Sequence, residues 1–161
     1  MAEPLKARYG PEIPRRIAAM IERVHPVFPT RAFVAQALRG YEDLELMPRA
    51  RHVARAMADH LPPDYPTALD VVLRSLGPPI EAGTGNGMAP FLYLPHVFWV
   101  ADAGLDHLDD SVRAMHAITR RFTFEFGIRP FVERYPREML AVLDRWCDDP
   151  DVHVRRLVSE G

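Results

Sequence analysis

The segment Thr119–Phe131, TRRFTFEFGIRPF, contains the residues whose types most clearly suggest chemistry. Its single carboxylate, Glu125, lies directly between Phe124 and Phe126. Burial of a carboxylate among apolar side chains carries a desolvation penalty, so the group either protonates more readily or acquires a cationic partner. Two interpretations are open. Glu125 belongs to a structural ion pair where helices meet, or it lines a groove and binds a cationic ligand.

Arginines flank Glu125 on both sides. Arg121 precedes it by four residues and Arg129 follows it by four, so a helical segment would place all three side chains on one face. The planar guanidinium donates several hydrogen bonds and suits phosphate. Ordinary surface solvation is the alternative explanation for these charges. The candidates for phosphate contacts or carboxylate partners are Arg120, Arg121, Arg129, Arg155 and Arg156.

Other catalytic and metal-binding patterns are not found. The glycine-rich GTGNG, residues 83–87, lacks the Gly-Lys-Ser/Thr ending of a phosphate-binding loop. The acids of LDHLDD, residues 105–110, are better explained as helix caps than as metal ligands. No GxSxG or HExxH motif occurs. The sequence therefore predicts neither a metal nor another cofactor.

The composition is that of a globular protein. With 161 residues, of which 48% are hydrophobic and 26% charged, the chain can form one domain with an apolar core. The net charge is −2, and Lys6 is the single lysine, so nearly all positive charge is arginine. A genome that favours arginine codons would explain that bias as well as a functional need does. No apolar run of about 18 residues is present, and Cys147 has no second cysteine to pair with. We expect a cytoplasmic protein without a membrane span.

Apolar residues recur at helical spacing along almost the whole chain. We expect helices at 11–24, 30–40, 48–61, 67–76, 91–104, 111–121 with its pattern continuing toward 135, 136–146 and 151–160. Thr30, Asp109 or Asp110, and Asp149 with Pro150 are the expected caps. Residues 77–90 contain several glycines and prolines and are predicted to form one long internal loop.

Pairs of these helices recur at roughly forty-residue spacing, the period of HEAT-type units. The predicted fold is an all-α, HEAT-like helical-repeat α-solenoid in which residues 1–161 form one domain. A closed helical bundle is the rival, because the repeats are not obviously similar to each other. The sequence stops after an apolar face formed by Val154, Leu157 and Val158, whereas terminal repeats normally carry a polar face. We therefore expect a solenoid truncated at its C-terminus.

The sequence contains the motifs MAEPLK (1–6), LPPDYPTAL (61–69), SLGPP (75–79), GNGMAPFLYLPHVFWVADAGLD (85–106), RRFTFEFGIRPF (120–131) and DPDVHVRRLVSEG (149–161). These motifs, spread from one end of the chain to the other, resemble the AlkC branch of the AlkC/AlkD-type DNA alkylation repair glycosylases. The resemblance implies HEAT-like repeats and hydrolysis of the N-glycosidic bond of cationic N3-alkylated bases, notably 3-methyladenine, in alkylated double-stranded DNA. It implies no cofactor, no membrane and no obligate protein partner.

The same resemblance assigns roles to two acids. Glu125 matches a family active-site glutamate and Glu160 matches a second, although Glu160 taken alone is typical of a solvated surface acid. The family also uses a tryptophan and an aspartate in later repeats, beyond the end of this sequence. A bifunctional glycosylase with lyase activity needs an amine nucleophile, and Lys6 is a poor candidate, so a monofunctional enzyme is expected. The alternative is a helical-repeat module that binds DNA or a peptide without catalysis.

Overall fold

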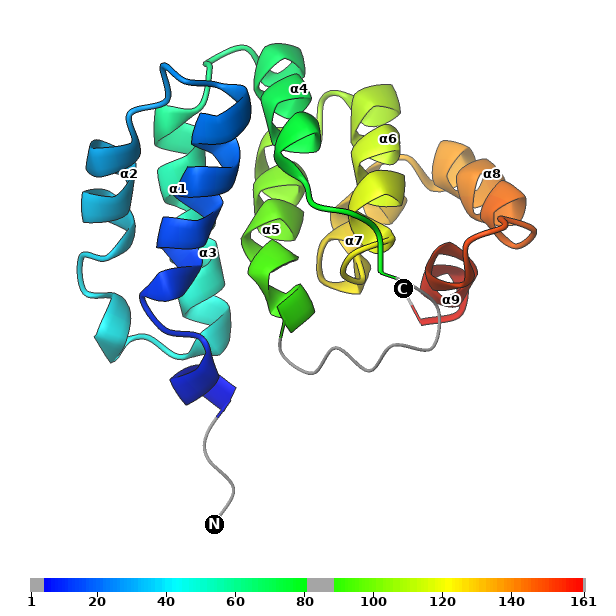
Figure 1. Ribbon diagram of the computed structural model, residues 1–161. Helices are drawn as coiled ribbons and strands as arrows, with labels where there is room; N and C mark the ends of the chain where they lie inside the picture. Colours follow the sequence, from blue (N-terminus) through cyan, green and yellow to red (C-terminus); the bar gives the residue numbers. More distant parts are fainter. Residues whose placement is uncertain (1–4, 81–88, 161) are drawn as a thin grey trace.

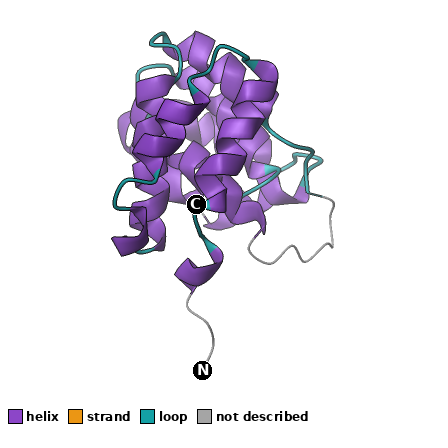
Figure 2. Ribbon diagram, turned by 60° about the vertical axis from the view of Figure 1, so that its left-hand side comes forward, coloured by secondary structure: helices purple, strands orange, loops and turns teal. Residues whose placement is uncertain are grey.

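The computed structural model describes residues 5–80 and 89–160, and within them helices are joined by turns without any strand (Figure 2). The elements are η1 Leu5–Arg8, α1 Glu12–Val24, α2 Thr30–Ala37, η2 Tyr41–Asp43, α3 Leu46–His60, α4 Tyr65–Ser75, η3 Ala89–Tyr93, α5 Leu94–Ala103, α6 Leu108–Thr119, α7 Glu125–Arg134, α8 Pro136–Trp146 and α9 Val152–Glu160. The predicted all-α fold class is confirmed.

The helices stack in two rows (Figure 1). In one row α1 contacts α4, α4 contacts α6, and α6 contacts α9. In the other row α3 contacts α5, α5 contacts α7, and α7 contacts α8. Each helix of a row therefore packs on the helix before it, and the helices do not surround a common axis. This is the arrangement of an α-solenoid. The predicted helical-repeat solenoid is confirmed, and the closed bundle is not formed.

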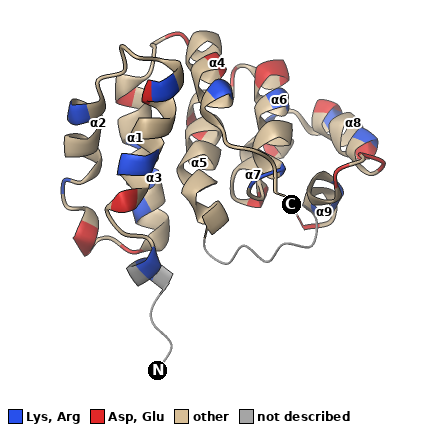
Figure 3. Cartoon of the chain, viewed as in Figure 1, with Lys and Arg blue, Asp and Glu red and all other residues tan. Residues whose placement is uncertain are grey.

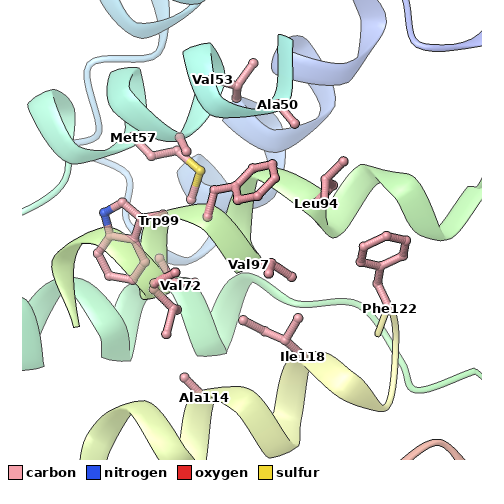
Figure 4. Close-up of a cluster of buried hydrophobic side chains, with 14 of the residues drawn as sticks. Ala50, Val53, Met57, Val72, Leu94, Val97, Trp99, Ala114, Ile118 and Phe122 are labelled. Carbon is pink, nitrogen blue, oxygen red and sulfur yellow. The ribbon is translucent and has the colours of Figure 1, made fainter. Parts of the chain in front are cut away.

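The helix α5 runs through the middle of the stack and explains the most apolar part of the sequence. All of its residues from 94 to 101 are buried, and Asp102 is its only charged residue (Figure 3). Side chains of α3, α4, α5 and α6 meet in this core, with Trp99 among them (Figure 4). A helix surrounded on all sides needs no polar face, so this segment lacks the amphipathic pattern of its neighbours.

Two expected helix caps are wrong in detail. Thr30 is the first residue of α2 rather than its cap, and its hydroxyl donates a hydrogen bond to Glu22 at 2.9 Å. Asp109 and Asp110 lie within the first turn of α6 rather than at its cap. Their charges still favour that position, because the amino end of a helix carries partial positive charge.

The predicted loop at 77–90 is described only at its ends. Residues 81–88, which include the GTGNG motif, lie outside the described residues. Residues 77–80 are not helical, whereas Ala89 and Pro90 begin η3, so the loop prediction is wrong at its last two positions. In the described ranges no helix has the length and apolar character needed to cross a bilayer.

Candidate active site

Glu125 is the first residue of α7, because the helical conformation is interrupted between α6 and α7. The preceding helix α6 ends at Thr119, and residues 120–124 form a turn. Arg121 therefore lies before α7, so the expectation that Arg121, Glu125 and Arg129 share one helical face is wrong. The Glu125 carboxylate instead lies at the amino end of a helix, where the backbone dipoles favour a negative charge.

Gly127 sets how closely α7 approaches α5. A Cβ atom at this position would lie 2.8 Å from Val97 Cγ1 and 2.9 Å from Phe124 Cε1, which is closer than carbon atoms pack. Only glycine allows this approach without displacing a neighbour. Because Glu125 lies in the same helical turn as Gly127, the close packing of α7 on α5 also positions the carboxylate.

Glu125 lines a cavity of about 330 Å³ formed by the α6–α7 turn, α7, α9 and the region around η3. Aromatic rings form part of its wall. The Phe91 and Phe122 ring centroids are 5.0 Å apart, and Phe122 stacks on Phe126 at 6.1 Å with an interplanar angle of 11°. Phe126 is 37% exposed. The cavity therefore combines a half-buried carboxylate with an open aromatic surface.

A second hollow shares Glu125 and Phe126 with the first and adds Arg129, Pro130 and Glu133. The pair Glu125–Phe126 thus contributes to two concave surfaces. Arg129 is exposed at the second hollow. Within the part of the chain that the structure describes, no hydrogen bond or ion pair engages the Glu125 carboxylate, so it can accept one from a ligand.

Glu160 is linked to the cavity through Arg156. The Arg156 Nε atom donates to Glu160 Oε2 at 2.8 Å, and Arg156 also lines the cavity. The hydrogen bond and charge of Glu160 raise the pKa of Arg156, with a smaller contribution from the charge of Glu125. One guanidinium therefore interacts with both predicted carboxylates, although Glu160 itself is exposed.

Arg121 also lines the cavity, but two of its donors bond to the main chain. Its Nη1 atom donates to the Ala117 carbonyl at 2.6 Å, and its Nε atom donates to the Gly77 carbonyl. Partial burial lowers the pKa of Arg121. The side chain braces the segment after α4 against the end of α6.

Arg120 and Arg155 both contact the turn between α8 and α9. Arg120 Nε lies 3.0 Å from Asp151 Oδ2, and Arg155 Nη1 donates to the Asp149 carbonyl at 2.6 Å. DNA contact by any of the five predicted arginines stays a prediction.

His153 lines the cavity together with Arg156 and was not among the residues predicted from the sequence. Its Nε2 atom is buried without a hydrogen-bond partner among the described residues. The spacing of three residues between His153 and Arg156 on one helix was the available signal. Within 5–80 and 89–160, no group of three or more potential metal-binding side chains comes together.

Fold and site together define a helical-repeat solenoid with a cavity that holds a carboxylate, aromatic rings and arginine. No known family model matches the chain. The structure of the Pseudomonas fluorescens alkylpurine DNA glycosylase AlkC, bound to DNA containing an abasic site analog, matches with a TM-score of 0.85 and 31% identity over 100% of this chain. The AlkC resemblance inferred from the motifs is thereby confirmed.

A curated relative has no assigned activity. The uncharacterized protein YhaZ of Bacillus subtilis (strain 168) is 30% identical over 158 residues, which are 98% of this chain and 42% of YhaZ. The chain also covers 43% of the AlkC chain. It therefore spans less than half the length of each of these two proteins.

Proposed function

We propose that this chain acts in DNA repair as part of a monofunctional DNA glycosylase, which removes cationic N3-alkylated bases such as 3-methyladenine from double-stranded DNA. The observation that carries the proposal is the half-buried Glu125 carboxylate beside an aromatic wall, in a solenoid that matches AlkC. AlkC was solved with DNA containing an abasic site analog, and an abasic site is what remains after a glycosylase removes a base.

The chemistry needs little acid catalysis because an N3-alkylated base is already cationic. When the C1′–N bond breaks, its electron pair stays on the base, which leaves neutral, and the positive charge passes to the sugar. A carboxylate near C1′ stabilises this oxocarbenium character and orients water. Water then adds to C1′ and gives a proton to the Glu125 carboxylate or to solvent. Glu125 thus acts by electrostatics and by water positioning.

The neighbouring residues suit a cationic, planar base and a polyanionic strand. Exposed aromatic faces such as that of Phe126 attract cations and stack on bases. Glu160 assists through Arg156, which donates to Glu160 and lines the same cavity as Glu125. Arg129 and Arg156 combine exposure with a place at the hollows, so they are the best candidates among the five arginines for phosphate contacts.

A lyase step is not expected. Such a step requires an amine that forms a Schiff base with the sugar. Lys6 is the only lysine, and it lies in η1, where it pairs with Glu45. The described lining of the cavity contains no lysine.

Release of free 3-methyladenine from methylated duplex DNA tests the proposal, with this chain and the product of the whole gene assayed side by side. We expect release that leaves abasic sites and unbroken strands. Salt-sensitive DNA binding without any base release from either protein would contradict the glycosylase and support the non-catalytic binding module.

A further inference from the structure

Two ion pairs connect the carboxyl end of α6 to the turn that precedes α9, and the proposed chemistry uses none of their four side chains. His116 Nε2 lies 2.8 Å from Asp149 Oδ2, and Arg120 Nε lies 3.0 Å from Asp151 Oδ2. The aspartate side chains are only 13% and 16% exposed. We call His116, Arg120, Asp149 and Asp151 the α6–α9 clasp.

Each aspartate of the clasp uses its second oxygen to hold the backbone that enters α9. Asp149 Oδ1 accepts the Asp151 N–H at 2.8 Å, and Asp151 Oδ1 accepts the His153 N–H at 2.9 Å. Asp149 thus joins a side chain of α6 to the main chain of the turn before α9. Asp151 joins Arg120, which directly follows α6, to the main chain of α9. Hydrogen bonds to ionised groups are short and about twice as strong as neutral ones.

The first turn of α9 is the part that reaches the cavity. His153 lies on it and Arg156 follows one turn later, and both line the same cavity as Glu125. Buried Val154 and Leu157 also attach α9 to the stack, and Arg155 donates to the Asp149 and Pro150 carbonyls in the turn before it. Apolar burial is not directional, so it holds the helix on the stack without fixing its position along α6. The clasp supplies that position.

We propose that the α6–α9 clasp is a positioning device: His116 and Arg120, acting through the two aspartates, hold α9 so that Arg156 stays next to Glu125. This inference rests on the proposed function, because it concerns the same cavity. It gives Arg120 a supporting role inside the protein in place of a contact with DNA.

Hydrogen exchange of the α9 amides tests the clasp without reference to activity. In Arg120→Gln we expect these amides to exchange about tenfold faster, while exchange in α1 to α5 is unchanged. Arg120→Lys should restore most of the protection. The matched control is Arg113→Gln, which removes an exposed pair with Asp110 on the same helix (2.6 Å) and should behave as wild type. His116→Phe keeps a ring beside Trp146, removes the other half of the clasp, and should also accelerate exchange.

Single-turnover base release completes the test. If the clasp positions Arg156, Arg120→Gln should lower the single-turnover rate of base release about tenfold and change DNA affinity less than twofold. Unchanged α9 exchange in both Arg120→Gln and His116→Phe would overturn the proposal, as would faster exchange with an unchanged rate of base release in an active protein. Faster exchange in a protein whose wild type releases no base would support the clasp and contradict the glycosylase instead.

Discussion

Arg49 near one end of the solenoid and Arg156 near the other lie in opposite surroundings. Arg49, in α3, is only 7% exposed, and its guanidinium donates to four main-chain carbonyls at 2.8 to 3.0 Å, those of Lys6, Tyr9, Glu42 and Leu44. Arg156, in α9, has a side chain that is 63% exposed and donates to one carboxylate, Glu160. The first arginine connects three segments of chain, whereas the second borders a cavity.

The difference supports the proposed location of the ligand site. A buried guanidinium that donates to main-chain carbonyls stabilises the fold and is not accessible to a ligand. An exposed ion pair contributes about 0 to 1 kcal/mol, so a phosphate or a cationic base can compete for either partner. Arg49 therefore stabilises the α1–α3 end, and the exposed pair of Arg156 supports the proposal that the α6–α9 end binds the ligand.

The largest effect should come from Arg49→Met. The variant keeps the length of the side chain but removes a charged donor from four carbonyls, and a hydrogen bond to a charged group contributes about 1.5 to 3 kcal/mol. We expect the free energy of unfolding to fall by about 4 kcal/mol in urea titrations. The control Arg16→Met, on the exposed side of α1, should change it by less than about 0.5 kcal/mol. Equal effects of the two variants would remove the contrast between the ends.

A similar effect is expected at His96 in α5, between the two ends. Burial lowers the pKa of His96 from 6.5 to about 4, and its ring nitrogens have no hydrogen-bond partner among the described residues. The unfolded chain therefore binds an extra proton between these two values, so stability falls as pH drops through that window. We expect the wild type to lose about 3 kcal/mol more than His96→Leu between pH 6.5 and 4. Parallel pH profiles would show that His96 is not buried in the neutral form.

Gly127→Ala should act on the recognition end. The added methyl group would press on Val97 and Phe124, and such overpacking costs about 1 to 3 kcal/mol. Because Glu125 lies in the same turn, base release should fall together with stability. Arg129→Ala offers a control at an exposed position of the same helix and should leave stability nearly unchanged.

The smallest change in stability should come from Arg156→Gln. Loss of its exposed pair with Glu160 should alter the free energy of unfolding by less than about 1 kcal/mol, while base release declines. A destabilisation as large as that of Arg49→Met would show that the two arginines serve the fold alike.

The helices could be predicted from the sequence because apolar spacing, proline and glycine are local signals. The break before α7 could not, because Phe122 follows Ile118 by four residues and so continues the apolar spacing of α6 past its end. The start of α7 depends on tertiary packing, since Gly127 allows α7 to contact α5 directly. The contacts of Arg121 were likewise out of reach, because one of its acceptors, the Gly77 carbonyl, is 44 residues away in the sequence.

The site was predictable in part. The apolar neighbours of Glu125 marked it, and the structure places Glu125 in a cavity with Arg121 and Arg156. The wall formed by Phe91, Phe122 and Phe126 was not anticipated. Phe91 lies in η3, far from the other two rings in the sequence, and only tertiary packing brings it to Phe122.

Single-turnover release of 3-methyladenine by Glu125→Gln tests the central claim most directly. The variant keeps the shape of the side chain and removes its charge. We expect the free energy of unfolding to stay within about 0.5 kcal/mol of wild type and the rate to fall at least about tenfold, which corresponds to roughly 1.4 kcal/mol of barrier. Glu138→Gln, which changes an exposed glutamate in the first turn of α8, should release base at the wild-type rate. Equal rates for Glu125→Gln and wild type would contradict a catalytic role for this carboxylate.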